Sequence, residues 1–94
     1  MTIITNSTTA DTISICGLMV HVLPEKIAEV KPHILAIAGS EIHAIGERGN
    51  LVVTIESDHY KKTADRITEL QKLKGILSAA MIYQHTEELG NRLN

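Results

Sequence analysis

The residues of this chain best suited to chemistry are its five histidines and its single cysteine, Cys16. Imidazole and thiolate groups bind transition metals when several converge, and a Cys-x-x-Cys pair is a common sequence sign of such a site. No such pair exists here, and the expected strand order places His21 and His85 at opposite rims of a sheet. The other three histidines fall on the far edge or near the helices. We therefore expect no metal site and no cofactor.

Groups that could catalyse a reaction are equally scattered. The segment Gly46–Gly49 (GERG) is typical of a hairpin turn and not of a phosphate-binding loop, which follows a strand and opens a helix. The adjacent carboxylates Glu87 and Glu88 fall in the expected C-terminal tail, outside any expected pocket. Because an enzyme needs converging groups, we expect a binding protein and not an enzyme.

Composition narrows the class of partner. The chain has 94 residues, 44% of them hydrophobic, which suits one domain with an aliphatic core. A net charge of −2 and only two aromatic residues, Tyr60 and Tyr83, argue against nucleic acid as a ligand. No apolar run approaches the ~18 residues of a membrane span, so we expect no direct membrane insertion. The N-terminus also lacks the basic and apolar regions of a secretory leader, so we expect the protein to stay where it is made.

The elements that must position any site follow from the pattern of apolar residues, which predicts two successive strand–helix–strand units. The strands are expected over Ile13–Val22, Glu41–Glu47, Leu51–Glu56 and Ile76–His85, and the helices over Pro24–Ala38 and Tyr60–Lys74. Two such units predict an α+β domain at residues 13–86, between tails at 1–12 and 87–94. We expect a four-stranded antiparallel sheet with both helices on one face and the other face uncovered.

Two details of the helices are also predicted. Pro32 interrupts the first apolar stripe and should kink or reset that helix. Ser57 or Asp58 should cap the second helix. The expected apolar stripe of the second helix consists of Tyr60, Ala64, Ile67, Leu70 and Leu73.

Alternation along each strand assigns side chains to the two faces of the sheet. The side chains expected to face the helices are Cys16, Leu18, Val20, Val22, Ile42, Ala44, Leu51, Val53, Ile55, Ala80 and Ile82. Those expected on the uncovered face are Gly17, Met19, His21, His43, Ile45, Val52, Thr54, Glu56, Ala79, Met81, Tyr83 and His85. Cys16 is then a buried thiol acting as a small hydrophobe, with a reactive thiol as the alternative. A register slip of one residue would reverse any of these assignments.

The uncovered face is therefore expected to be mostly apolar and to carry two methionines, Met19 and Met81. Flexible methionine suits a surface that adapts to an apolar partner, and Gly17 would leave room for close approach. Exposed apolar patches usually mark interaction sites. The alternatives are that these residues are scattered, or that they are buried in a homodimer.

The chain resembles the NapD family, the cytoplasmic assembly chaperones of the periplasmic nitrate reductase. The resemblance is in the order and spacing of four segments: residues 16–20 (CGLMV), 39–42 (GSEI), 51–56 (LVVTIE) and 75–83 (GILSAAMIY). It spans about Ile13 to Glu88. It implies a ferredoxin-like βαββαβ fold and a cytoplasmic protein. It also implies binding of the twin-arginine signal peptide of the catalytic subunit, which would hold back export until the molybdenum cofactor is inserted.

A twin-arginine signal peptide carries a basic pair followed by an apolar stretch. Folded as an amphipathic helix, it could lie on the apolar sheet face while acidic groups attract its arginines. Glu41, Glu47, Glu56 and Asp58 are candidates for these acids. The expected peptide-binding residues are Gly17, Met19, His21, Ile45, Val52, Met81, Tyr83, Glu47 and Glu56. The peptide could instead add a strand at the edge formed by residues 41–47.

Two other readings of the same fold lead to different predictions. A small-ligand-sensing regulatory domain would dimerise stably through its sheet, whereas the chaperone is expected to be a monomer or a weak dimer. An acylphosphatase-like hydrolase would need an N-terminal, arginine-bearing phosphate loop, which the sequence lacks.

Overall fold

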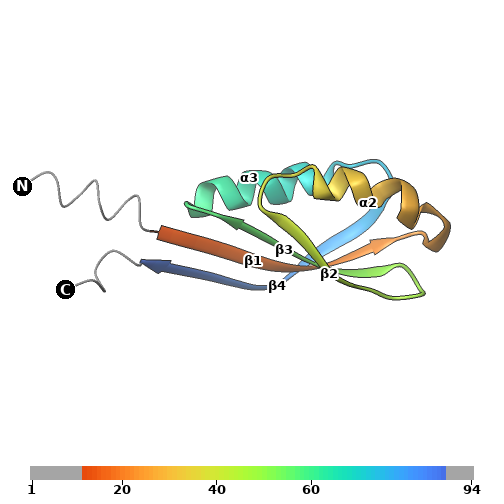
Figure 1. Cartoon of the computed structure of the whole chain (residues 1–94), viewed down its shortest axis with the longest axis horizontal. Coiled ribbons are helices and arrows are strands. Elements are labelled where there is room, and N and C mark those ends of the chain that lie inside the picture. The colour runs from red at the N-terminus through yellow and green to blue at the C-terminus, as the bar shows by residue number, and fades with distance from the viewer. Residues whose placement is uncertain (1–11, 89–94) are drawn as a thin grey trace, which may run out of the picture.

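A computed structural model describes residues 12–88 and shows one four-stranded sheet. Its elements are β1 (Thr12–Val22), the 3-10 helix η1 (Pro24–Lys26), α2 (Ile27–Leu35), β2 (Ser40–Ile45), β3 (Asn50–Ser57), α3 (Tyr60–Gln71) and β4 (Ile76–Glu88). The strand order is β2-β3-β1-β4, and every neighbouring pair is antiparallel. Both helices cover the same face of the sheet (Figure 1). The predicted ferredoxin-like βαββαβ fold is confirmed.

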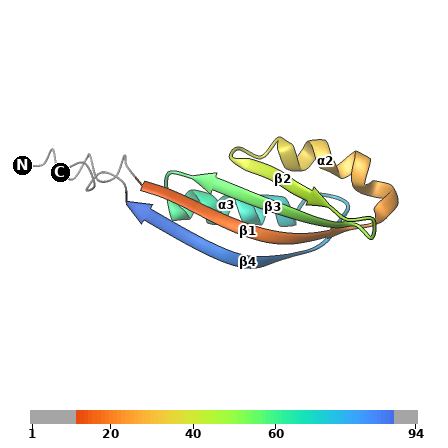
Figure 2. The same cartoon turned by 60° about the horizontal axis from the view of Figure 1, so that its bottom comes forward.

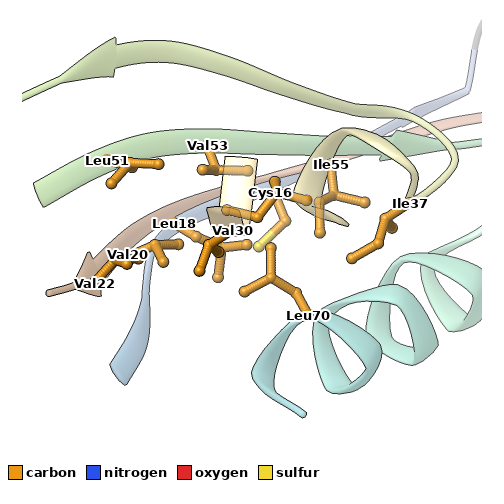
Figure 3. Packing of buried hydrophobic residues seen from close by; sticks show 11 residues of the cluster. Cys16, Leu18, Val20, Val22, Val30, Ile37, Leu51, Val53, Ile55 and Leu70 are labelled. Carbon is orange, nitrogen blue, oxygen red and sulfur yellow. The ribbon is translucent and has the colours of Figure 1, made fainter. Parts of the chain in front are cut away.

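The core lies between the sheet and the helices (Figure 3). The side chains predicted to face the helices from the two central strands are all at most 1% exposed: Cys16, Leu18, Val20 and Val22 on β1, and Leu51, Val53 and Ile55 on β3. Val30 and Ile34 of α2, Leu70 of α3 and the nearby Ile37 close the cluster from the other side. The prediction that Cys16 is a buried thiol is therefore confirmed, and burial raises its pKa.

The first helix is interrupted at a different position from the predicted one. The chain turns through η1 before α2 begins at Ile27, and Pro32 lies inside α2 without ending it. The missing amide of a proline costs one hydrogen bond within the helix. The ladder is re-established after it, because the Ala36 amide donates to the Pro32 carbonyl at 3.0 Å.

The second helix is capped and buried differently from the prediction. Its cap is His59, whose Nδ1 accepts from the Lys61 amide at 3.0 Å. Its buried residues are Leu70 and Thr63, whereas Tyr60 is 51% exposed and Ala64 is also exposed. Thr63 can be buried because its hydroxyl lies 2.7 Å from Ser57 Oγ, so that its polar group has a partner.

The last strand is longer than predicted, since β4 runs to Glu88 instead of ending at His85. β4 forms one edge of the sheet, and β2 forms the opposite edge (Figure 2). Between Thr12 and Glu88, neither α-helix has the length and apolar character needed to cross a membrane.

Candidate functional site

The sheet face opposite the helices, called the open face from here on, is uncovered within residues 12–88 and faces the viewer in Figure 2. Cross-strand pairs identify its residues, because directly opposed side chains point to the same face. Gly17 pairs with Thr54 and Met19 pairs with Val52, whereas the buried Leu18 pairs with the buried Val53. The open-face assignments of Gly17, Met19, Val52 and Thr54 are therefore confirmed.

A groove of about 690 Å³ occupies part of this face. Its apolar lining consists of Ile13, Ile15, Val52 and Tyr83, from β1, β3 and β4. Ile13 and Ile15 were not among the residues predicted for the site. Their positions follow from the alternation that places Gly17 and Met19 on the same face, so the pattern was sufficient to find them.

Acidic groups gather at one end of the groove. Glu41, Glu56 and Asp58 all line it, and Glu56 lies opposite Ile15 across β1 and β3. Glu41 pairs with Thr54, two residues from Glu56, and such diagonal neighbours on one face lie about 7–8 Å apart. Glu47 lies in the turn between β2 and β3 and does not line the groove.

The three acids differ in their own partners. Lys62 Nζ lies 2.9 Å from Asp58 Oδ1, and this hydrogen bond and the lysine charge hold the pKa of Asp58 below its ordinary value. Glu41 lies 3.5 Å from His43 Nε2, an ion pair only when that histidine is protonated. Within residues 12–88 the Glu56 carboxylate forms no ion pair. Glu56 is thus the acid of the groove most open to an incoming cation.

A β-bulge in β4 corrects the prediction for that strand. Leu18 pairs with Met81 and Gly17 pairs with Tyr83, so Ile82 has no counterpart on β1. Because one extra residue shifts the alternation, Tyr83 and His85 lie on the open face as predicted, but Met81 lies on the helix side. Ala79 and Ala80 are reversed as well, since they pair with Val20 and Met19.

A second bulge corrects the prediction for β2. Ile42 pairs with Val53 and Ala44 pairs with Val52, which leaves His43 without a counterpart. Ile45 pairs with the buried Leu51, so it lies on the helix side and not on the open face. Ala44, which was predicted to face the helices, lies on the open face.

The two bulges bring edge-strand side chains over the middle of the open face. His43 Nε2 is hydrogen bonded to Thr54 Oγ1 at 2.6 Å, and the ring of Tyr83 lies over Gly17. Since Gly17 and Thr54 are themselves paired, His43, Thr54, Gly17 and Tyr83 form one row across all four strands. The room that Gly17 was expected to leave for a partner is taken by Tyr83.

The remaining predicted site residues lie beyond this row. Met19 and Val52 are half-buried neighbours on the open face. His21 is exposed at the far rim, where its Nδ1 is hydrogen bonded to Ser78 Oγ at 3.2 Å. The open face therefore has an acidic end around Glu56 and a neutral, apolar half around Met19.

The histidines do not gather into a metal centre in the described structure. Among residues 12–88, no group of three or more His, Cys, Asp or Glu side chains is arranged to hold a metal ion. The groove on the open face offers apolar contacts and carboxylates to a ligand.

Three comparisons with known proteins each find NapD proteins. The family model described as "NapD protein" matches residues 13–88. The chain is similar to Chaperone NapD of Haemophilus influenzae, with 24% identity over 75 residues that cover 79% of this chain and 81% of the relative. It is also similar to the solution structure of the E. coli Tat proofreading chaperone protein NapD, with a TM-score of 0.72 and 23% identity. That match covers 81% of this chain and 80% of the other, and at this identity it shows a shared fold.

Proposed function

Since the chain belongs to the NapD family of chaperones, we propose that it binds the twin-arginine signal peptide of the periplasmic nitrate reductase catalytic subunit. Binding in the cytoplasm restrains export until the molybdenum cofactor is inserted and the subunit has folded. The role is that of a binding protein without catalysis. The observation that carries the proposal is the open-face groove, which combines an apolar lining with carboxylates at one end.

The two parts of the groove match the two parts of such a peptide. The arginine pair belongs at the acidic end, where, among residues 12–88, Glu56 forms no ion pair and Glu41 lies next to His43. The methylene stems of the arginines can pack on Ile13 and Ile15, which lie at that end. The apolar stretch that follows the arginines then crosses the row at Tyr83 toward Val52 and Met19.

Most of the affinity must come from apolar burial. Exposed carboxylate–arginine pairs contribute about 0.2–1 kcal/mol each, whereas apolar burial contributes roughly 25 cal/mol per Å² before the cost of ordering the peptide. The acids therefore select and orient the peptide, and the apolar lining holds it.

Isothermal titration with a synthetic signal peptide tests this function, using two charge reversals as a matched pair. Glu56→Arg changes an acid that lines the groove, and Glu47→Arg makes the same change in the hairpin turn, away from the groove. We expect about a tenfold loss of affinity for Glu56→Arg and less than about a twofold change for Glu47→Arg, because only nearby charges couple strongly. A peptide with both arginines replaced by aspartate should bind at least about tenfold more weakly, because repulsion from the groove acids replaces attraction.

Two outcomes would count against the proposal. Equal losses for the two variants would show a general charge effect instead of a site at Glu56. No binding by the unaltered protein, together with a concentration-independent dimer in solution, would favour the regulatory domain that dimerises through its sheet.

A further inference from the structure

Gly17 is buried although it lies on the open face. The three atoms nearest to a Cβ added at this position all belong to Tyr83. Such a Cβ would lie 2.7 Å from Cδ2 and Cζ of the ring, and closer still to Cε2. The ring of Tyr83 therefore lies across the backbone of β1 at the one position of that strand without a side chain.

The backbone of Gly17 does not itself require glycine. Among residues 12–88, the glycines with positive φ are Gly39, Gly49 and Gly75, whereas Gly17 lies within β1 and has no positive φ. Alanine at this position would be free of backbone strain, and glycine inside a strand normally costs stability relative to alanine. What Gly17 provides is space above the strand.

This space allows the ring of Tyr83 to lie over β1. Tyr83 belongs to the edge strand β4, yet it lines the same groove as Glu41 and His43 of the opposite edge strand β2. Lying over β1 brings the ring toward them, and a methyl group at residue 17 would force the ring to move.

We propose that Gly17 is a positioning residue for peptide binding, which acts by letting the ring of Tyr83 lie across β1 as a wall of the groove. The ligand in this proposal is the one given under the proposed function, on which the binding part rests. The placement of the ring rests on the structure of the free protein.

Gly17→Ala is the minimal test, and Gly46→Ala is its matched control. Gly46 also has no positive φ, and a Cβ added there meets nothing closer than 3.5 Å. We expect Gly17→Ala to weaken binding of the synthetic twin-arginine signal peptide by at least about tenfold, as for a group that anchors an interface. Gly46→Ala should leave the affinity within about twofold. Both variants should retain the circular dichroism spectrum of the unaltered protein.

A double-mutant cycle separates positioning from direct contact. If Gly17 acts through Tyr83, Gly17→Ala should have less than about a twofold further effect in a Tyr83→Ala background, because the clash is gone. An equal loss in both backgrounds would mean that residue 17 meets the peptide itself, which would overturn the proposal. An unchanged affinity for Gly17→Ala alone would also overturn it.

Proton NMR of the free protein decides the position of the ring without any peptide. The Hα resonances of Gly17 should be shifted upfield by the ring current of Tyr83 and should return to ordinary strand values in Tyr83→Ala. Ordinary Gly17 shifts in the unaltered protein would overturn the proposal even if the peptide binds. Upfield shifts without any peptide binding would refute the proposed function and the binding role of Gly17, while confirming the ring placement.

Discussion

Met81 lies directly opposite Leu18 across the ladder between β1 and β4. Leu18 is completely buried in the core, so the Met81 side chain points to the helix side of the sheet. It remains 53% exposed because β4 is an edge strand. Met19, by contrast, pairs with Val52 on the open face. The two methionines predicted to share a binding surface are therefore on opposite faces.

This relationship predicts different effects for the same substitution at the two methionines. Met19→Gln should weaken binding of the signal peptide about three- to tenfold, because it removes apolar surface from the open face, where we propose that the peptide binds. Met81→Gln should change the affinity less than about twofold. Isothermal titration measures both, and a larger effect for Met81→Gln would place the peptide on the helix side or around the β4 edge.

Val53 and Val52 provide a test of the two faces by stability. Val53 is fully buried, whereas Val52 is partly exposed on the open face. Val53→Asp should destabilise the domain by about 3–5 kcal/mol or more, since it buries an unpaired charge. A domain of this size has about 5–15 kcal/mol in total, so the variant should lose a large fraction of its stability and unfold at a much lower urea concentration. Val52→Asp should remain folded, and urea unfolding followed by circular dichroism distinguishes the two.

The pair of Asp58 and Lys62 predicts a dependence on pH. The folded-state pKa of Asp58 lies below the ordinary value of 3.8, so the stabilisation is present above pH 3.8 and is lost as the pH falls through the folded-state pKa. Lys62→Met should raise the pKa of Asp58 toward 3.8 and remove a small stabilisation at neutral pH. Lys61→Met, at a neighbouring exposed lysine without an ion pair in residues 12–88, should leave the pKa unchanged. Carboxyl NMR titration measures the pKa, and an unchanged value in Lys62→Met would contradict the role of the lysine.

Cys16 predicts a thiol that is protected by the fold. It is fully buried, and burial raises its pKa from 9.0, so the fraction present as reactive thiolate at pH 8 is smaller than for a free thiol. A disulfide reagent at pH 8 should label the native protein very slowly and the urea-unfolded protein at once. Rapid stoichiometric labelling of the native protein would revive the alternative of a reactive thiol.

The sequence was sufficient for the central part of the fold. Along β3, alternation separated Leu51, Val53 and Ile55 from Val52, Thr54 and Glu56, and the structure keeps that separation. One face of the sheet is buried there and the other is not, which fixes the register. The ladder between β1 and β3 also has no irregularity, so the alternation of side chains holds along its whole length. The order of the segments was also sufficient to indicate the family.

Side-chain capping and burial on α3 were not predictable from the apolar stripe alone. Thr63 replaces Tyr60 and Ala64 as a buried residue because Ser57 and Ser14 lie within hydrogen-bond distance of its hydroxyl. Ser14 is 49 residues away in the chain, so only the folded arrangement brings these hydroxyl groups together.

The sequence by itself therefore determined the type and order of the main elements, the core of the two central strands and the family, because these depend on local periodicity and segment order. The tertiary structure decided the open face. The bulges at His43 and Ile82 are set by pairing with the neighbouring strand, and each reverses the alternation beyond it. They move Ile45 and Met81 to the helix side and bring His43 and Tyr83 over Thr54 and Gly17. An edge strand is paired on one side only, so it can accommodate an extra residue that a strand paired on both sides would resist.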